Sequence, residues 1–147
     1  MNLWHVTDRI KVAVIGVGAL GQHHARYYAD LVASGMVEFV GVYDEDTARA
    51  EEIAAKHGVS TLKSLAEASE VADAISIVTP TVTHFDLAKG LLGKGRHVLV
   101  EKPMTEQAAQ AAKLVQLAQD NNCVLQVGHV ERFNPVFDYL QEAASDP

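Results

Sequence analysis

The sequence is poor in cysteine and in basic residues. It contains one cysteine, Cys123, among 147 residues, so no disulfide can form within the chain. A sequence without a disulfide framework does not indicate an oxidising compartment, and we expect a cytoplasmic location. There are 12 Lys and Arg against 19 Asp and Glu, for a formal net charge of -7. Because binding to a nucleic-acid backbone needs clustered positive charge, we expect no nucleic-acid partner.

Long apolar runs are also missing. No window approaches the roughly 18 apolar residues that are needed to span a bilayer. The first residues, MNLWHVTDRIKVAVIG, lack the basic segment and long apolar run of a secretory signal. We therefore expect no membrane partner, and we assign no metal ligands. The length and the hydrophobic content of 48% are ordinary for one soluble domain with a substantial core.

Apolar runs alternate with helical patterns along most of the chain, which predicts βαβ units. Such units imply an α/β fold of the doubly wound Rossmann type, with a mostly parallel sheet and helices on both faces. Strands are expected at 11–15, 37–43, 61–62, 74–78, 97–100 and 124–127. Helices are expected at 20–32, 47–57, 65–69 and 84–92. A further helix is expected from an N-cap at Thr105, with Glu106 in its first turn, to about residue 121.

A glycine cluster, GVGALG, follows the first expected strand and opens the first expected helix. In that context the GxGxxG pattern predicts a dinucleotide site at residues 16–21, where Ala19 and Leu20 lie between the second and third glycines. Gly16 permits a tight turn, Gly18 lets the backbone approach a pyrophosphate, and Gly21 lets the helix pack closely on the strand. N–H groups at the helix start would hold the phosphates. A glycine-rich turn without a ligand is the alternative.

Asp44 ends the second expected strand, 23 residues beyond Gly21. A carboxylate there accepts hydrogen bonds from the ribose hydroxyls of an adenosine and repels a 2′-phosphate, which favours NAD over NADP. Glu45 and Asp46 add negative charge, although Arg49 could reach back over a helical turn. Alternatively, Asp44 only caps the next helix.

Polar residues follow two later strands at the edge where ligands of such sheets bind. Thr79 and Pro80 would line the cofactor groove, with His84 early in the next helix. An ordinary polar contact explains His84 as well as a functional role does. Lys102, in Glu101-Lys102-Pro103, could hydrogen-bond a hydroxyl that becomes a carbonyl. Pro103 could turn through a cis bond and aim this lysine into the cleft. An exposed salt bridge is the alternative.

The sixth expected strand ends in GHVERFNP, a third polar cluster at the same edge. His129 and Arg132 are candidates for the substrate side of the site. His129 could instead be a core or interface histidine, and Glu131 and Arg132 could simply pair with each other.

Together, VAVIGVGALGQHHA, VYD, TPTVTH, EKPMT and VGHVERFNP resemble the glucose-fructose oxidoreductase/inositol dehydrogenase (Gfo/Idh/MocA) family in order and approximate spacing, from about Val12 to Pro135. The resemblance implies an NAD-dependent oxidoreductase. It implies that Lys102 contacts the substrate and nicotinamide region and acts in catalysis, and that Asp44 binds ribose. His84 matches the helix-start histidine of the family, and Glu101 is placed with the cofactor-binding residues.

Members of that family continue into a second α/β domain, which carries a general-base histidine. No such segment lies downstream of Lys102 here, so we assign 1–127 to an NAD(P)-binding Rossmann domain and 128–147 to the start of a connection to an absent substrate domain. We expect the chain to be inactive or nearly so alone. The second domain would cover Phe133, Val136, Phe137, Tyr139 and Leu140, so their exposure predicts a homo-oligomer.

The expected reaction is the oxidation or reduction of a ring hydroxyl of a sugar, nucleotide sugar or cyclitol, with NAD as cofactor and NADP second. The ERFNP ending resembles members that act on nucleotide-linked amino sugars of the UDP-N-acetylglucosamine type. The alternative is a dinucleotide-binding sensor or scaffold module that does not catalyse.

Overall fold

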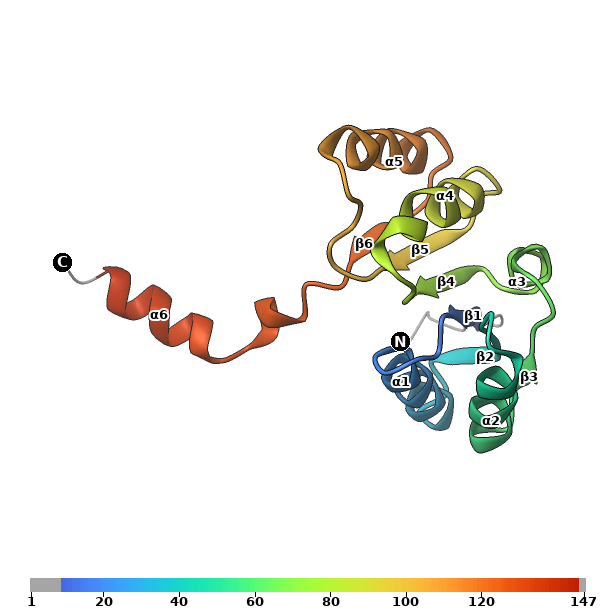
Figure 1. Ribbon diagram of the computed structural model, residues 1–147. Coiled ribbons are helices and arrows are strands. Elements are labelled where there is room, and N and C mark those ends of the chain that lie inside the picture. The colour runs from blue at the N-terminus through green and yellow to red at the C-terminus, as the bar shows by residue number, and fades with distance from the viewer. Residues whose placement is uncertain (1–8, 146–147) are drawn as a thin grey trace, which may run out of the picture.

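A six-stranded, entirely parallel sheet forms the centre of the molecule (Figure 1). The computed structural model describes residues 9–145. The strand order is β3-β2-β1-β4-β5-β6. The chain runs outward from β1 to β3 and then returns to place β4 beside β1, which makes the β1/β4 junction the switch point where such sheets bind ligands. The strands are β1 Ile10–Ile15, β2 Val37–Tyr43, β3 Ser60–Thr61, β4 Ala74–Ile77, β5 His97–Val100 and β6 Leu125–Val127.

Helices cover both faces of this sheet, which confirms the doubly wound fold. The helices α1 and α2 pack on one face, and α3, α4 and α5 pack on the other. The helical elements are α1 Gly21–Ala33, α2 Thr47–His57, α3 Leu65–Val71, α4 Thr81–Leu92, α5 Ala108–Asp120, the 3-10 helix η1 Val130–Phe133 and α6 Val136–Ser145.

Side chains of β1 alternate between two apolar cores, as the period of two in a strand requires. Val12 and Val14 face the core that contains Ala25 of α1. Ala13 and Ile15 face the opposite core, beneath α3 and α4. Because both faces of the sheet are covered, β1 reads as a continuous apolar run rather than as an alternating one.

Two expectations for the helix starts were wrong. Thr105 does not cap α5: its hydroxyl donates to the carbonyl of Gln107 within a turn, and Gln107 is the residue that precedes the helix. A threonine hydroxyl can satisfy a nearby backbone group in this way and so compete with helix formation. Glu106 therefore lies outside the first turn. The helix α4 begins at Thr81, three residues before His84.

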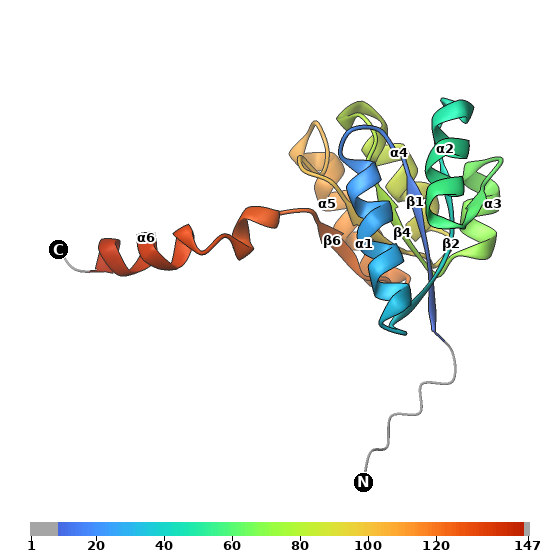
Figure 2. The same cartoon turned by 90° about the horizontal axis from the view of Figure 1, so that it is seen from below.

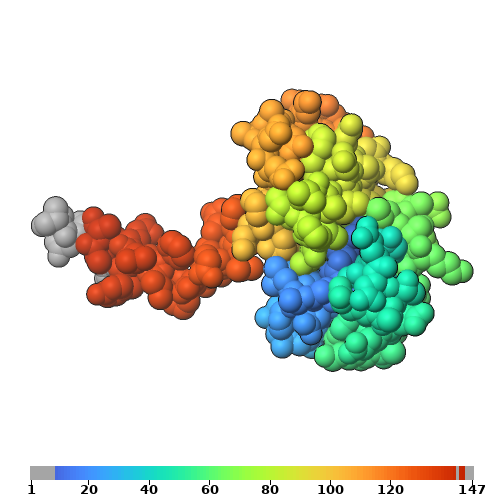
Figure 3. Space-filling view, in the orientation of Figure 1, coloured from blue at the N-terminus to red at the C-terminus, as the bar shows by residue number. Residues whose placement is uncertain are grey.

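The segment after β6 leaves the sheet. The elements η1 and α6 extend away from the body of the molecule (Figures 2 and 3). Large apolar side chains stay exposed along it, as the sequence predicted: Phe133 at 85%, Val136 at 55%, Phe137 at 50%, Tyr139 at 70% and Leu140 at 51%. Within the described part of the chain, no helix is long and apolar enough to cross a membrane.

Tyr28 of α1 is hydrogen-bonded to the fully buried Ser76 of β4, with 2.8 Å between the two hydroxyl oxygens. Burial raises the pKa of the Tyr28 phenol above its ordinary value of 10.0, and the hydrogen bond to Ser76 acts in the opposite direction. The folded state therefore favours the neutral phenol. The preference of the folded state for the neutral phenol contributes to the free energy of unfolding. That contribution is complete below pH 10 and is lost as the pH rises above 10.

We predict that Tyr28→Phe lowers the free energy of unfolding at neutral pH by about 1–3 kcal/mol, because the Ser76 hydroxyl loses its partner. The variant should also lose less stability than the parent between pH 9 and 11. Urea unfolding across that range measures both effects. Tyr27→Phe is the matched control, because Tyr27 is 57% exposed on the same helix. Equal alkaline slopes for the parent and Tyr28→Phe would contradict the prediction.

Candidate functional site

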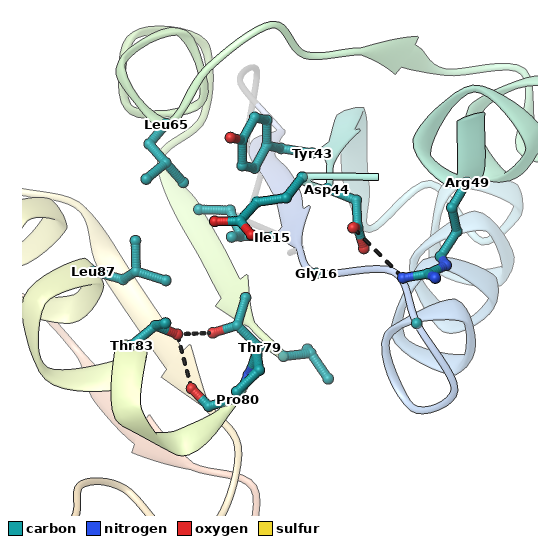
Figure 4. Close-up of a pocket in the computed structure, with 13 residues that line it drawn as sticks. Ile15, Gly16, Tyr43, Asp44, Arg49, Leu65, Thr79, Pro80, Thr83 and Leu87 are labelled. Carbon is teal, nitrogen blue, oxygen red and sulfur yellow. Dashed lines mark hydrogen bonds and ion pairs between the residues drawn. The ribbon is translucent and has the colours of Figure 1, made fainter. Parts of the chain in front are cut away.

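A cavity of about 460 Å³ lies at the carboxyl ends of β1, β2 and β4 (Figure 4). Its position at the switch point is where a doubly wound sheet binds its ligand. Leu65 and Leu87 from the helix layer provide apolar walls. The residues that line the cavity are Ile15, Gly16, Gly18, Tyr43, Asp44, Glu45, Arg49, Leu65, Val78, Thr79, Pro80, Thr83 and Leu87.

The packing of the protein itself requires two of the three glycines. Gly16 has a φ of +83°, and a Cβ there would lie 2.5 Å from the Val78 carbonyl oxygen. A Cβ on Gly21 would overlap the Gly16 carbonyl oxygen. These two residues let α1 begin directly against the end of β1. They would be needed even if nothing bound here.

Gly18 is different, because the fold does not require a glycine there. A Cβ on Gly18 would meet only Arg49 Nη1, at 3.8 Å, and the φ of Gly18 does not lie in the left-handed region. A side chain at this position would instead extend into the space beside the cavity wall. A glycine here is what the close approach of a pyrophosphate to the backbone would require, and this role of Gly18 stays a prediction.

Backbone donors are available at the same turn. Within residues 9–145, the N–H groups of Gly18, Ala19 and Leu20 have no hydrogen-bond partner. No side chain caps the N-terminus of α1. Free N–H groups at a helix N-terminus, where the helix dipole is positive, bind phosphate groups. Ala19 and Leu20 are exposed at this turn beside the cavity, and the donor set fits the diphosphate of NAD.

Asp44 holds the glycine turn in place. Its Oδ2 accepts from the Val17 N–H at 2.8 Å, and its Oδ1 accepts from the Asp46 N–H at 2.9 Å. The residue that caps α2 is Asp46, which accepts from the Arg49 N–H. The helix-cap interpretation of Asp44 is therefore wrong, and its carboxylate stays at the cavity wall with a side chain only 11% exposed.

The turn after β4 forms the opposite wall. The Thr83 hydroxyl donates to the Pro80 carbonyl at 2.8 Å and lies 2.7 Å from the Thr79 hydroxyl (Figure 4). Because a hydroxyl has one proton, the Thr79 hydroxyl is the donor to Thr83. Thr79 and Pro80 line the cavity as expected from the sequence, and Thr83 joins them.

His84 lies beneath this wall rather than in it. Its side chain is buried, with Nδ1 2.9 Å from the Pro103 carbonyl oxygen and Nε2 2.8 Å from the Thr79 carbonyl oxygen. A carbonyl can only accept, so a neutral ring donates to one of them and a doubly protonated ring to both. His84 thus connects the turn after β4 to the turn after β5, and it does not line the cavity.

Glu101 is buried as well. Its Oε1 lies 3.1 Å from His24 Nε2, and its Oε2 accepts from the Lys102 N–H at 3.1 Å. A Cβ on Gly128 would overlap this carboxylate. The acid therefore ties α1 to the ends of β5 and β6, and the structure does not bring it to the cavity wall.

A second cleft, of about 790 Å³, contains the substrate-side candidates. Lys102, His129 and Arg132 line it together with Pro103, Gly128 and Phe137. The peptide bond between Lys102 and Pro103 is cis, as expected. Lys102 is exposed, and among the described residues its ammonium group has no partner. Glu131 does not pair with Arg132 but accepts from the Asn134 side chain.

The sequence-predicted residues lie in three places: the cavity at the carboxyl ends of β1, β2 and β4, which is the first cleft; the second cleft; and the scaffold between the two. Gly16, Gly18, Asp44, Thr79 and Pro80 line the first cleft. His84 and Glu101 are in the scaffold. Sequence reasoning missed the apolar walls, such as Leu65 and Leu87, which carry no motif. No group of three or more side chains that could hold a metal ion occurs among the described residues.

Comparison with known proteins gives a consistent result. A family model described as "Oxidoreductase family, NAD-binding Rossmann fold" matches residues 10–129. UDP-N-acetylglucosamine 3-dehydrogenase of Acidithiobacillus ferrooxidans is 40% identical over 134 residues, which cover 91% of this chain and 41% of that protein. The scyllo-inositol 2-dehydrogenase (NAD(+)) of Bacillus subtilis is 31% identical, with 88% of this chain and 38% of that protein covered.

Solved structures agree with these matches. GenD2 from gentamicin A biosynthesis, in complex with NAD, superposes with a TM-score of 0.86 at 30% identity, over 99% of this chain and 42% of that one. The A. ferrooxidans enzyme superposes with a TM-score of 0.83 at 39% identity, over 92% of this chain and 43% of that one. The chain therefore spans about two fifths of the length of the relatives it matches.

We predict that Gly18→Ala and Gly21→Ala separate ligand binding from folding. Gly18→Ala should leave the melting temperature nearly unchanged and weaken NAD binding about tenfold or more, which is about 1.4 kcal/mol, because the methyl group occupies the ligand's approach. Gly21→Ala should lower the melting temperature, because its Cβ overlaps the Gly16 carbonyl. Thermal unfolding and NAD titration measure the two effects. Unchanged NAD affinity in Gly18→Ala would mean that the turn serves only the fold.

Proposed function

The chain belongs to the oxidoreductase family whose NAD-binding Rossmann fold matches residues 10–129, and on that premise we propose that it is the cofactor-binding part of a dehydrogenase acting on a ring hydroxyl. The substrate class is a sugar, nucleotide sugar or cyclitol. One observation carries the proposal: the free ammonium of Lys102 lies in a cleft with His129 and Arg132, beyond the end of β5. A cofactor along the adjacent carboxyl edge would extend toward this cleft.

The residues of the first cleft bind and orient the cofactor. The N–H groups of Gly18, Ala19 and Leu20 hold the diphosphate, and the Asp44 carboxylate accepts hydrogen bonds from the adenosine ribose. Leu65 and Leu87 provide apolar surface for the adenine. The bound cofactor would supply the hydride acceptor, the C4 carbon of the nicotinamide.

Lys102 acts on the oxygen of the reacting hydroxyl. Its ammonium donates a hydrogen bond to that oxygen and stabilises the negative charge that develops as the hydroxyl proton leaves. The resemblance places the base that takes this proton in the second domain of the family, outside these 147 residues. Arg132 and His129 offer donors to further polar groups of the substrate from the same cleft.

A nucleotide-linked amino sugar is the substrate we favour. The motif ERFNP follows the histidine of the second cleft, and the relative that is 40% identical is named UDP-N-acetylglucosamine 3-dehydrogenase. The matched region is 41% of that protein, so this substrate is part of our proposal for the chain. We also propose a cytoplasmic location and self-association through the exposed apolar residues of α6.

We predict that the purified chain binds NAD more tightly than NADP, as measured by calorimetric titration. Asp44→Ala should weaken NAD binding about tenfold or more, since a hydrogen bond to a charged group contributes about 1.5–3 kcal/mol. Asp44→Asn is the second variant, because it keeps an acceptor for the Val17 N–H and removes the charge. Equal affinities of all three proteins for NAD would show that Asp44 does not contact the ribose.

We predict that Lys102→Ala leaves the NAD affinity of the chain within a few-fold. The chain alone should reduce little NAD with UDP-N-acetylglucosamine or inositol, and robust turnover would contradict this. If the reading frame continues beyond Pro147 by ~150–200 residues, the substitution in the longer protein should lower kcat about a hundredfold or more. Arg132→Ala should mainly raise KM. A longer protein whose turnover does not depend on Lys102 would contradict the proposed role.

A sensor or scaffold module would also bind NAD with the same affinity before and after Lys102→Ala, so NAD affinity does not separate the two functions. A longer form of such a protein would not turn over a hydroxyl substrate. The kinetic comparison of the parent and Lys102→Ala in the longer form therefore separates the two functions.

A further inference from the structure

Arg49 is the one basic side chain among the described residues that line the cofactor cavity. It comes from the first turn of α2 and is 46% exposed. Asp44 and Glu45 line the same cavity, and Asp46, the next residue in the sequence, pairs with Arg49. Rossmann domains distinguish NAD from NADP at the end of the second strand, by an acid for the ribose hydroxyls or an arginine for the 2′-phosphate. This rim contains both kinds of residue.

Two carboxylates hold the Arg49 guanidinium. Its Nη2 lies 3.1 Å from Asp46 Oδ2, and its Nη1 lies 3.6 Å from Asp44 Oδ1 (Figure 4 shows the contact with Asp44). The same Nη1 would lie 3.8 Å from a Cβ on Gly18. The guanidinium therefore lies beside the glycine turn, between the two acids, where a group on the adenosine ribose would meet it.

The two acids differ in how freely they could release Arg49. Asp44 is fixed by two backbone donors and is 11% exposed. Asp46 is 48% exposed and uses one oxygen to cap α2 and the other to pair with Arg49. An exposed ion pair of this kind is weak. One change at Asp46 therefore suffices to leave Arg49 with only its longer contact to Asp44.

We propose that Asp46 sets the cofactor preference by holding Arg49 in an ion pair, so that loss of the Asp46 carboxylate frees Arg49 to bind a phosphate on the ribose 2′ oxygen. This inference rests on the cofactor binding of the proposed function. It gives Asp44 and Asp46 separate tasks. Asp44 accepts hydrogen bonds from the ribose hydroxyls. Asp46 pairs with the Arg49 guanidinium, whose positive charge a 2′-phosphate would need.

Three variants test the proposal. Asp46→Asn removes the charge and keeps the cap of α2, because Asn and Asp cap helices about equally well. The double variant Asp46→Asn/Arg49→Gln removes the freed guanidinium as well. Glu45→Gln is the matched control: it removes the same charge from the same rim, and among the described residues Glu45 has no contact with Arg49.

Adenosine 5′-monophosphate and adenosine 2′,5′-bisphosphate are the probes, with NAD and NADP in parallel. They differ only in the 2′-phosphate and engage only the adenosine side of the cavity. Calorimetry at low and high salt should show that Asp46→Asn raises the affinity for the bisphosphate, relative to the monophosphate, about tenfold. The gain should be lost in the double variant, be much smaller in Glu45→Gln, and shrink at high salt.

Other results would overturn the proposal. A gain that persists in the double variant, or that Glu45→Gln matches, would assign the effect to net charge and not to Arg49. No gain in Asp46→Asn would mean that Asp44 alone excludes the phosphate. If neither probe nor NAD binds the parent chain, this inference fails together with the proposed cofactor site. If the probes bind and no hydroxyl substrate turns over, only the proposed reaction fails.

Discussion

The close approach of α1 to the end of β1 is the constraint on which the cofactor cleft depends. Gly21 and Gly16 meet at a contact that no side chain would fit, and Gly16 itself is pressed against the turn after β4. Because the helix begins there without a side-chain cap, the N–H groups of Gly18 to Leu20 have no partner within residues 9–145 and lie beside the cavity. The packing that closes the fold thus also leaves N–H donors of the kind that bind phosphate groups at helix N-termini.

The same helix fixes the two clefts relative to each other. His24 and Tyr28 lie four residues apart, so they point from one face of α1. Tyr28 reaches Ser76 of β4, and His24 reaches Glu101 at the end of β5. The helix that begins at the glycine turn is therefore tied to β4 and to the end of β5, two of the three strands beyond the switch point. A movement of α1 would shift the cofactor donors and the Lys102 turn together.

His84 adds a second tie between these strand ends. Its ring lies between the carbonyls of Thr79, beside the cofactor cavity, and Pro103, beside the Lys102 cleft. Neither polar atom of the ring is left to contact a ligand. The geometry gives His84 the role of holding the turn after β4 and the turn after β5 at a fixed distance from each other.

Much of the fold could be predicted from the sequence, because hydrophobic runs and glycines report local constraints. The strands at 37–43 and 97–100 and the helix at 47–57 have the predicted bounds. The start of α5 could not be predicted, because a threonine hydroxyl serves equally well in a cap or in a turn, and only the fold decides between them. The cap of α2 was open for the same reason: a cap was the alternative role of Asp44, and the structure gives the cap to Asp46 while Asp44 accepts from the Val17 N–H.

The candidate site shows the same limit. Motif positions such as Gly18, Asp44 and Lys102 could be placed at the sheet edge from the order of the strands alone. The motif could not show that Glu101 points inward, because its contacts depend on residues far apart in the sequence. The contact of Arg49 with Asp44 is local, and the sequence indicated that Arg49 could reach back over a helical turn. His24 and Glu101 are 77 residues apart, and no local pattern records their contact.

The contrast between Glu101 and Lys102 explains why an acid and a base follow one another at the end of β5. Successive residues of an extended segment point to opposite sides. Glu101 therefore enters the space that Gly128 leaves open, where His24 and the Lys102 N–H satisfy its carboxylate. Lys102 points outward into the second cleft. A buried carboxylate with its own partners cannot neutralise the neighbouring ammonium by a direct contact. The acid thus fixes the backbone that carries the lysine, and among the described residues the Lys102 ammonium group keeps no partner.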